Sequence, residues 1–371
     1  MQNGSATVVP EGLTPLIPGS EVKVRKSSGY FEGVQCLRFA AALMVVCAHA
    51  TFYAKERLAP GTTVWDAGTA GVNIFFVISG FVMMKTAPKF QTLPNGWIGF
   101  GLRRLARIVP LYWLMTSFKL LALLVAPAAV LHAKIDWGFI TKSYFFVPAY
   151  NSDGQVEPLL GVGWTLLYEM MFYLIVTVAI AVRANILLFC TVVLGLCATG
   201  SLVRPEHFPA GLLYFSPLML EFLIGMAIAK WPGAQRFPLA ACGMLIVIGF
   251  LILFFRPFMS LGIILLSRSI PAGMIVLGVV GLERFVPRFP RAMVFFGAAS
   301  YSLYLVHPLV APSAPAILAK LHLHSVALSV FGSLAVAITA AAVAFYMFEK
   351  PIGDYLSARM TRGTGSKLSK I

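Results

Sequence analysis

The sequence predicts an all-α, polytopic integral membrane protein with about ten transmembrane helices and both termini in the cytoplasm. Three observations predict this fold class. Of the 371 residues, 59% are hydrophobic and 12% are charged, whereas a soluble domain carries about 25% charged residues. The apolar residues form runs long enough to cross a bilayer. The basic residues form short clusters between those runs, which is the pattern that orients membrane proteins.

Ten apolar windows are expected to form the spans. They lie at 36–54, 67–85, 108–131, 163–182, 185–200, 212–230, 238–255, 260–282, 292–311 and 325–348. Each window is near the length that crosses about 30 Å of hydrocarbon at about 1.5 Å per residue. The window at 260–282 is the least typical, because it contains Arg268 and Pro271.

The distribution of basic residues predicts the orientation of these spans. With the N-terminus inside, 19 of the 29 Lys and Arg residues fall in inner segments, seven in outer loops and three within spans. Positive residues accumulate on the cytoplasmic side, so both ends are expected there. The expected parts are a polar cytoplasmic tail at 1–30, a transmembrane domain at 31–352 and a basic cytoplasmic tail at 353–371. The net charge of +15 then needs no nucleic-acid partner.

The cysteines and the longest loop carry different predictions. The five cysteines lie in or beside apolar runs without a CxxC or metal-ligand spacing. They are expected to be small buried hydrophobic side chains, with no disulfide and no metal site. The longest loop, at about 132–162, is polar enough to cap an extracytoplasmic cavity. Its polar residues are Asn151, Ser152, Asp153, Gln155 and Glu157.

Ionisable side chains inside the predicted spans are the first functional candidates. Placing one charged side chain at the centre of a bilayer costs about 2.5–3.5 kcal/mol on insertion scales. Such a residue is therefore first considered as a functional candidate. The set is Arg38, His49, Glu169, Glu221, Arg268 and His307, with Lys119 able to snorkel. Arg38 and His49 are eleven residues apart, which places them on one helix face and about 16 Å apart along the axis. A headgroup-level arginine and a packing histidine also explain this pair.

Three of these groups are expected at a common depth. Counting residues from the membrane surface puts His49, Glu169 and His307 in the outer half of three different helices. A polar cavity that opens outward and is shared by the three side chains explains this coincidence. The alternative is a purely structural hydrogen-bond network.

A cluster of arginines precedes the third expected span, and Arg103 and Arg107 lie one helical turn apart in it. At this spacing two guanidinium groups can hold one anion together, and guanidinium suits phosphate. The alternative is a plain positive-inside anchor. Arg38 is expected on the same side, so a cytoplasmic polyphosphate can meet all of these arginines.

Six segments, in order along the chain, together resemble the acyltransferase-3 family of membrane proteins. The first runs from Gly33 to Ala41, and ten residues separate its Arg38 from His49. The others are FFVISGF at 75–81, RRLARIVPLYW at 103–113, WTLLYEMMFY at 164–173, YSLYLVHP at 301–308 and FEKP at 348–351. The resemblance is nearest to stand-alone members that acetylate exopolysaccharide or lipid-linked sugars.

The resemblance implies a reaction and its substrates. An acyl group, usually acetyl, passes from cytoplasmic acetyl-CoA to a sugar hydroxyl at the outer side of the bacterial inner membrane. Acetyl-CoA is a donor substrate, and no bound cofactor is expected. The acceptor is a polysaccharide or lipid-linked sugar, and membrane lipid surrounds the chain. Polysaccharide-assembly proteins or a second copy of the chain are further partners that this implies.

The resemblance and the residue chemistry together suggest roles for individual side chains. His49 is the best general base because imidazole titrates nearest neutrality, and Glu169 can orient it or hold the sugar. His307 can assist or bind substrate. The arginines at 38, 103, 104 and 107 are expected to bind acyl-CoA. Hydroxyl donors to substrate or oxyanion are expected at Ser79, Tyr168, Tyr301 and Tyr304. Direct transfer and an acetyl-histidine intermediate both remain open.

Two other classes of protein share these features. A transporter or flippase is also polytopic, basic inside and lined with intramembrane Glu, His and Arg. The sequence lacks an evident pair of matching halves with broken helices, which disfavours this class. A structural subunit of a polysaccharide-export complex is the third class. Acetyl-CoA hydrolysis that depends on His49 would separate an enzyme from both.

Overall fold

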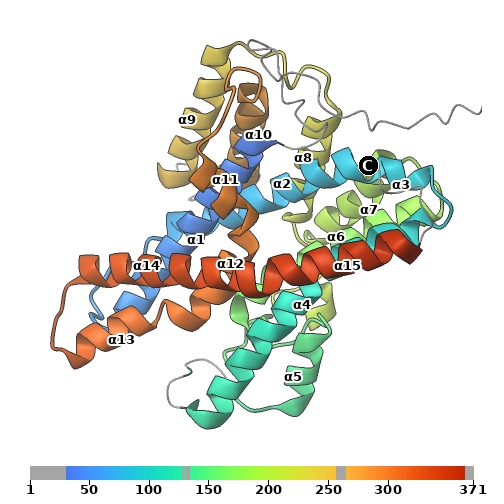
Figure 1. The fold of residues 1–371 in the computed structure, drawn as a ribbon. Coiled ribbons are helices and arrows are strands. Elements are labelled where there is room, and N and C mark those ends of the chain that lie inside the picture. Colours follow the sequence, from blue (N-terminus) through green and yellow to red (C-terminus); the bar gives the residue numbers. More distant parts are fainter. Residues whose placement is uncertain (1–30, 128–129, 131–133, 256–264, 364–371) are drawn as a thin grey trace, which may run out of the picture. The chain divides into compact units, whose positions relative to one another are not determined.

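The computed structural model describes residues 31–127, 130, 134–255 and 265–363. Every regular element in these ranges is a helix, and no β-strand forms there (Figure 1). The prediction of an all-α fold is confirmed. All five cysteines are free thiols.

Seven helical segments are long and apolar enough to cross a membrane. They are α1 (Glu32–Arg57), η1 with α2 and α3 (Asp66–Ala70, Gly71–Thr86, Pro88–Gln91), α4 (Gly96–Val125), η3 with α6 (Gly161–Gly163, Trp164–Ala181), η4 with α8 (Ala210–Tyr214, Met219–Lys230), α12 with α13 (Ser300–Val310, Ser313–Lys320), and α14 with η7 and the start of α15 (Val326–Ala344, Phe345–Glu349, Lys350–Gly363).

Three further apolar helices are shorter. They are α7 (Ile186–Gly200), α9 (Leu239–Phe255) and the π-helical turn η6 with α10 (Leu265–Ser269, Ile270–Leu282). Each of the ten expected windows therefore overlaps a helix. Because three of these helices are short, the count of ten spans and the placement of the termini stay predictions. Two other short helices, α5 (Trp137–Tyr144) and α11 (Arg291–Ala298), complete the fold.

Two expected windows are displaced in the structure. The third, 108–131, belongs to a helix that begins twelve residues earlier, at Gly96. The arginine cluster is therefore part of α4 instead of preceding it. The ninth, 292–311, is broken at Ala299 between α11 and α12. Its candidate span is Ser300–Lys320. His307 thus lies near the beginning of that span, whereas the count of residues along 292–311 had placed it near the end of its span.

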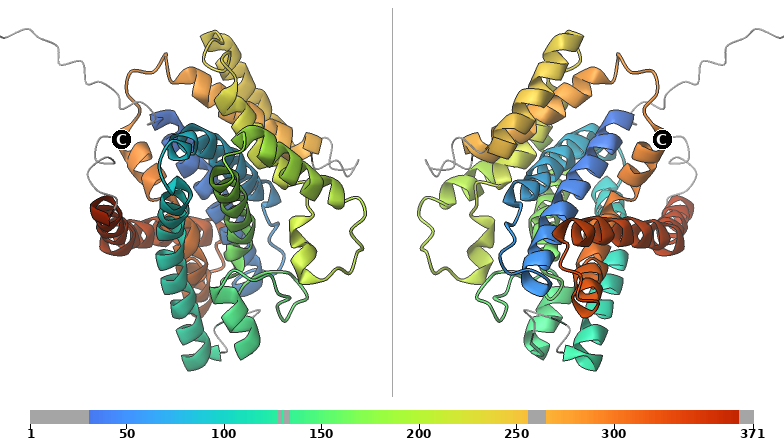
Figure 2. Two further views of the ribbon diagram at one scale, coloured as in Figure 1. Left: turned by 90° about the vertical axis from the view of Figure 1, so that its right-hand side faces the viewer. Right: turned by 90° about the vertical axis from the view of Figure 1, so that its left-hand side faces the viewer.

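The helices α1 and α2 carry most of the packing that surrounds the site. Helix α1 contacts α2, α11, α12 and α14, and α2 packs along α8. The α2–α8 crossing depends on glycine, since a Cβ at Gly80 would collide with the Phe222 carbonyl and one at Gly225 with the Val77 carbonyl. Small residues are the usual means by which helices approach closely in a bilayer. Helices α9 and α10 pair beside this core (Figure 2).

The last helical segment runs from α14 through the π-helical turn η7 into α15 without a break (Figure 1). It packs on α1 and α12 through α14 and on α4 through η7 and α15. Single π-helical turns in helices are frequent at functional sites. Here the turn ends at Glu349, whose side chain is buried between α4 and α12.

Candidate active site

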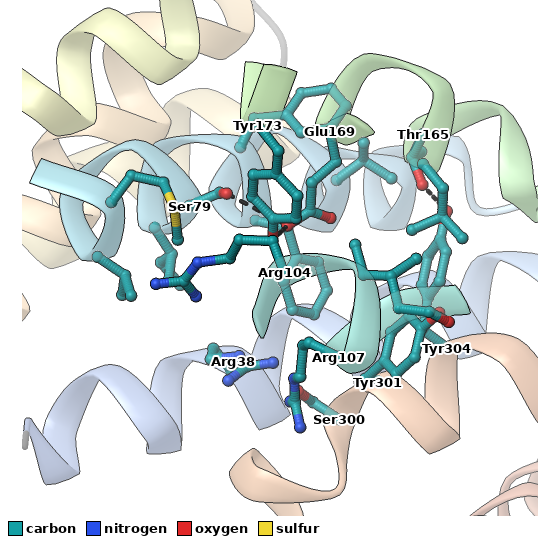
Figure 3. Close-up of a pocket in the computed structure, with 18 residues that line it drawn as sticks. Arg38, Ser79, Arg104, Arg107, Thr165, Glu169, Tyr173, Ser300, Tyr301 and Tyr304 are labelled. Atoms are coloured by element: carbon teal, nitrogen blue, oxygen red, sulfur yellow. Dashed lines mark hydrogen bonds between the residues drawn. The ribbon is translucent and has the colours of Figure 1, made fainter. Parts of the chain in front are cut away.

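Five helices enclose a small cationic cavity, here called the arginine pocket. Its volume is about 130 Å³, and Figure 3 shows its labelled side chains. The polar lining residues are Arg38 from α1, Ser79 from α2, Arg104 and Arg107 from α4, Thr165, Glu169 and Tyr173 from α6, and Ser300, Tyr301 and Tyr304 from α12. Residues 266 positions apart in the chain thus face one cavity, as Arg38 and Tyr304 do.

The arginines of this pocket retain unused hydrogen-bond donors. Arg38 makes one long hydrogen bond among the described residues, to Gln35 Oε1 at 3.4 Å. Arg104 donates from Nη2 to Thr86 Oγ1 at 2.9 Å, whereas its buried Nε has no partner. A guanidinium carries five N–H donors in a fork that matches phosphate and carboxylate. The pocket is therefore suited to an anionic or strongly polar ligand group.

Arg107 is held differently from the other two arginines. Its Nη1 pairs with Glu349 Oε1 at 2.5 Å. The other carboxylate oxygen of Glu349 accepts from the backbone N–H of Ser302 at 3.2 Å and from its hydroxyl at 2.6 Å. The carboxylate therefore fixes α4 against the beginning of α12 and leaves Arg107 partly neutralised.

Glu169 lies in the arginine pocket, away from the histidines. Its Oε1 accepts from the Ser79 hydroxyl at 3.2 Å and from the Tyr173 hydroxyl at 2.5 Å (Figure 3). The prediction that Glu169 shares a cavity with His49 and His307 is wrong in this structure. Counting residues along a span gives the height of a side chain but not the direction in which it points, and α6 presents Glu169 toward α2 and α4.

The two intramembrane histidines do come together. His307 Nε2 lies 3.1 Å from His49 Nδ1, and the ring centroids are 4.9 Å apart. His307 is fully buried, whereas His49 is half-buried and lines a second cavity. The two residues are 258 positions apart in the sequence. The sequence had placed the two histidines at a common depth, and the structure brings their side chains into contact, although His307 lines neither cavity.

The second cavity, here called the large cavity, has a volume of about 1090 Å³. Besides His49 it is lined by aromatic side chains, among them Phe52, Tyr53 and Trp164. The polar loop contributes Asn151, Ser152, Asp153, Gln155 and Glu157 to the same wall. The prediction that this loop covers a cavity is confirmed. Pockets for drug-sized ligands are about 300–1,000 Å³, so this one has room for an extended acceptor.

A hydrogen-bonded cluster separates the two cavities. The Tyr304 hydroxyl donates to the Val162 carbonyl at 3.0 Å and accepts from the Thr165 hydroxyl at 3.0 Å. Tyr304 and Thr165 line the arginine pocket, and Val162 lines the large cavity. The Tyr304 ring also lies 5.9 Å from the His307 ring, centroid to centroid. Tyr304 thus stands between the arginines and the histidines.

Besides His307, two expected site residues lie outside the lining of both cavities. The Arg103 guanidinium lies 5.9 Å from the Phe90 ring centroid, because α3 packs against that side of α4. The pair that was expected to grip an anion, Arg103 with Arg107, is therefore replaced by Arg104 with Arg107. Tyr168 is buried and donates to the Leu213 carbonyl at 2.9 Å, so its hydroxyl does not face substrate space.

Tyr301 lines the arginine pocket, although its hydroxyl proton is committed. It donates to the Ile108 carbonyl at 2.7 Å. Of the four expected hydroxyl donors, Ser79 is the one that donates its own proton to a side chain in the pocket, the Glu169 carboxylate.

Sequence reasoning missed two residues of this site. Tyr173 lies within the WTLLYEMMFY segment, but no role was predicted for it. It follows Glu169 by one helical turn, a spacing at which two side chains meet, and this spacing was the available signal. Glu349 was quoted within FEKP in the same way. A carboxyl group at the end of an apolar run was the available signal.

The fold and the two cavities define a helical membrane protein with a cationic pocket on one side of a hydrogen-bonded partition and a histidine pair on the other. The chain belongs to the acyltransferase-3 family, whose model, described as an acyltransferase domain, matches residues 31–347. The protein is therefore a membrane acyltransferase.

Three relatives illustrate the family. The exopolysaccharide production protein ExoZ of Rhizobium meliloti is 34% identical over 269 residues, which are 69% of this chain and 80% of the relative. The putative peptidoglycan O-acetyltransferase YrhL of Bacillus subtilis is 26% identical over 77% of this chain and 49% of its own length. Nodulation protein 10 of Rhizobium leguminosarum bv. viciae is 28% identical over 49% of this chain and 53% of its own length. No solved structure matches.

Proposed function

We propose that this protein is an O-acyltransferase of the bacterial inner membrane that acetylates a surface glycan. It moves an acetyl or other short acyl group from cytoplasmic acyl-CoA to a sugar hydroxyl of an exopolysaccharide or lipid-linked glycan at the outer side of the membrane. The names of the relatives, one for exopolysaccharide production and one for peptidoglycan O-acetylation, support this choice of acceptor.

The observation that supports the proposal most is that one helix, α1, contributes a side chain to each of the two cavities. Arg38 lines the arginine pocket and His49 lines the large cavity. Both side chains project from the same face of α1, about 16 Å apart along its axis. A donor with anionic phosphates and a long neutral arm suits such a separation, because its two ends need different surroundings.

The donor is assigned to the arginine pocket. The unused donors of Arg38 and Arg104 can bond polar oxygens of acyl-CoA, and charge-assisted hydrogen bonds of this kind are the strong ones. The pocket volume of about 130 Å³ holds only a part of such a molecule. The thioester end then reaches the histidines when the hydrogen bonds around Tyr304 break and the two cavities become connected.

The acceptor is assigned to the large cavity, where His49 acts as general base. A sugar hydroxyl is a poor nucleophile at neutral pH and needs a base within hydrogen-bond reach. As its oxygen bonds to the acyl carbon, its proton passes to His49. The C–S bond then breaks, and the proton returns from His49 to the CoA thiolate. The neighbouring hydroxyl groups and backbone donors stabilise the developing oxyanion.

Mass spectrometry of surface glycans tests the proposal in the cell. A deletion strain should lose one acyl increment from a glycan, and the wild-type gene should restore it. The His49→Ala gene should not restore it, although the variant should reach the membrane in normal amount. Full restoration by His49→Ala would contradict the assignment of the base. An unchanged glycan in the deletion strain would contradict the acyltransfer to a surface sugar.

A further inference from the structure

The contact between the two histidines determines which nitrogen of His49 carries the proton. This inference rests on the proposed function and adds to it the role of His307. Neutral imidazole has one N–H donor and one acceptor nitrogen, and the neighbours decide which is which.

The fully buried histidine is assigned first. His307 Nδ1 lies 3.1 Å from the Leu303 carbonyl oxygen, which can only accept. In addition, Pro308 has no N–H, so the Tyr304 carbonyl lacks the donor that would follow four residues later in the helix. Nδ1 of His307 therefore carries the proton. Its side chain is fully buried and no carboxylate contacts it among the described residues, which favours the neutral ring because an unpaired buried charge is costly.

The assignment of His49 follows from that of His307. Because the His307 ring is neutral and protonated at Nδ1, its Nε2 offers a lone pair. His49 Nδ1 thus faces two acceptors, His307 Nε2 at 3.1 Å and the Val45 carbonyl at 3.1 Å. It must be the N–H donor between them. The lone pair of His49 is then on Nε2, which has no hydrogen-bond partner in the described part of the chain.

We infer that His307 is a positioning residue that holds His49 in the tautomer whose Nε2 is the free base. When Nε2 takes the proton of the acceptor hydroxyl, His49 becomes an imidazolium, and its Nδ1–H bond to His307 becomes charge-assisted and stronger. His307 thus stabilises the charged form that exists only during the reaction. The carboxylate of a catalytic triad has this role, which a neutral imidazole takes here. The sequence had given it to Glu169.

Nitrogen NMR tests the tautomer directly. The full-length chain, labelled with ¹⁵N-histidine and placed in lipid nanodiscs, should show a one-bond N–H coupling at Nδ1 of His49 and none at Nε2. The signals that disappear in His49→Ala assign the ring among the six histidines of the chain. A proton on Nε2 of His49 in the wild type would overturn the inference, whatever the variants do.

Kinetics of two His307 variants test the role. The assay is CoA release from acetyl-CoA in the presence of polysaccharide extracted from the deletion strain. His307→Leu removes the acceptor and should lower kcat by about 10- to 100-fold, as loss of an orienting partner does. KM for acetyl-CoA should stay within about twofold, because the arginines are intact. His307→Gln offers an amide oxygen to His49 Nδ1 and should recover most of the loss.

The outcomes separate this inference from the function on which it rests. His207 is exposed and distant in sequence from both histidines, so His207→Leu is the control and should keep wild-type kcat. An inactive His49→Ala with a fully active His307→Leu would overturn the role of His307 alone. A Gln variant as inactive as the Leu variant, with the wild-type tautomer retained, would also overturn it. A fully active His49→Ala would instead contradict the proposed function.

Discussion

Arg103 and Arg104 are adjacent in the sequence and yet contact different surroundings, which makes them a matched pair for testing donor binding. Arg104 lines the arginine pocket with an unpartnered Nε. Arg103 lies over the Phe90 ring outside the pocket. Both substitutions to Gln remove one positive charge from the same helix turn. Only Arg104→Gln removes donors that face the proposed donor site.

The size of the effect follows from the bonds that are lost. A hydrogen bond to a charged group contributes about 1.5–3 kcal/mol. At about 1.4 kcal/mol per factor of ten, Arg104→Gln should weaken CoA binding roughly 10- to 150-fold. The same substitution gives up the hydrogen bond to Thr86, so stability should fall by only about 0.5–1.5 kcal/mol.

Calorimetric titration of CoA into the purified full-length protein measures this effect. The titrations are made at one ionic strength, because charge effects at a surface depend on salt. Arg103→Gln should bind CoA within about threefold of the wild type, as expected for a half-exposed charge that is largely screened. Equal weakening by the two variants would refute the reasoning, since it would mean that the cluster acts through its total charge and not through the pocket.

Two further predictions concern stability. Glu349→Gln keeps an acceptor for Ser302 but breaks the ion pair with Arg107. Thermal unfolding should show a loss of about 1–3 kcal/mol in stability. The loss is smaller than for a fully buried pair because the Arg107 side chain is 37% exposed. An unchanged unfolding temperature would contradict the inference that Glu349 holds α4 against α12. Gly225→Ala should destabilise by about 1–3 kcal/mol, because its Cβ meets the α2 backbone, whereas Gly243→Ala, which has nothing within 4 Å, should be neutral or mildly stabilising. Equal effects of the two alanines would refute the described α2–α8 crossing.

The helices of this fold could be predicted from the sequence because hydropathy reports directly on what lipid accepts. In the described residues, each of the ten apolar windows overlaps a helix. Their ends were less predictable. Nothing in hydropathy marks the break at Ala299. The stretch from Gly96 to Arg107 has the basic composition of a loop, although it forms the first turns of α4.

The site could be predicted only where the geometry of a single helix decided the positions of its side chains. The spacing of Arg38 and His49 fixed their common face. The contact between His49 and His307 could not be predicted, because it depends on how α12 is rotated against α1. The position of Glu169 depended on how α6 is rotated against α2 and α4, which the helix contacts decide. The choice between Arg103 and Arg104 depended on one aromatic ring, Phe90, in a short helix that hydropathy does not reveal.

The central claim is that donor and acceptor are served from different cavities, joined through the partition at Tyr304. Proteoliposomes test it most directly, with labelled acetyl-CoA outside and polysaccharide from the deletion strain trapped inside. Only molecules whose arginine pocket is open to the outside can then use the donor. The account predicts labelled acetyl groups on the trapped polysaccharide with the wild-type protein and none with His49→Ala. In a parallel sample, the polysaccharide is supplied outside, on the same side as acetyl-CoA. Label on this outer polysaccharide, with none on the trapped polysaccharide, would contradict the account.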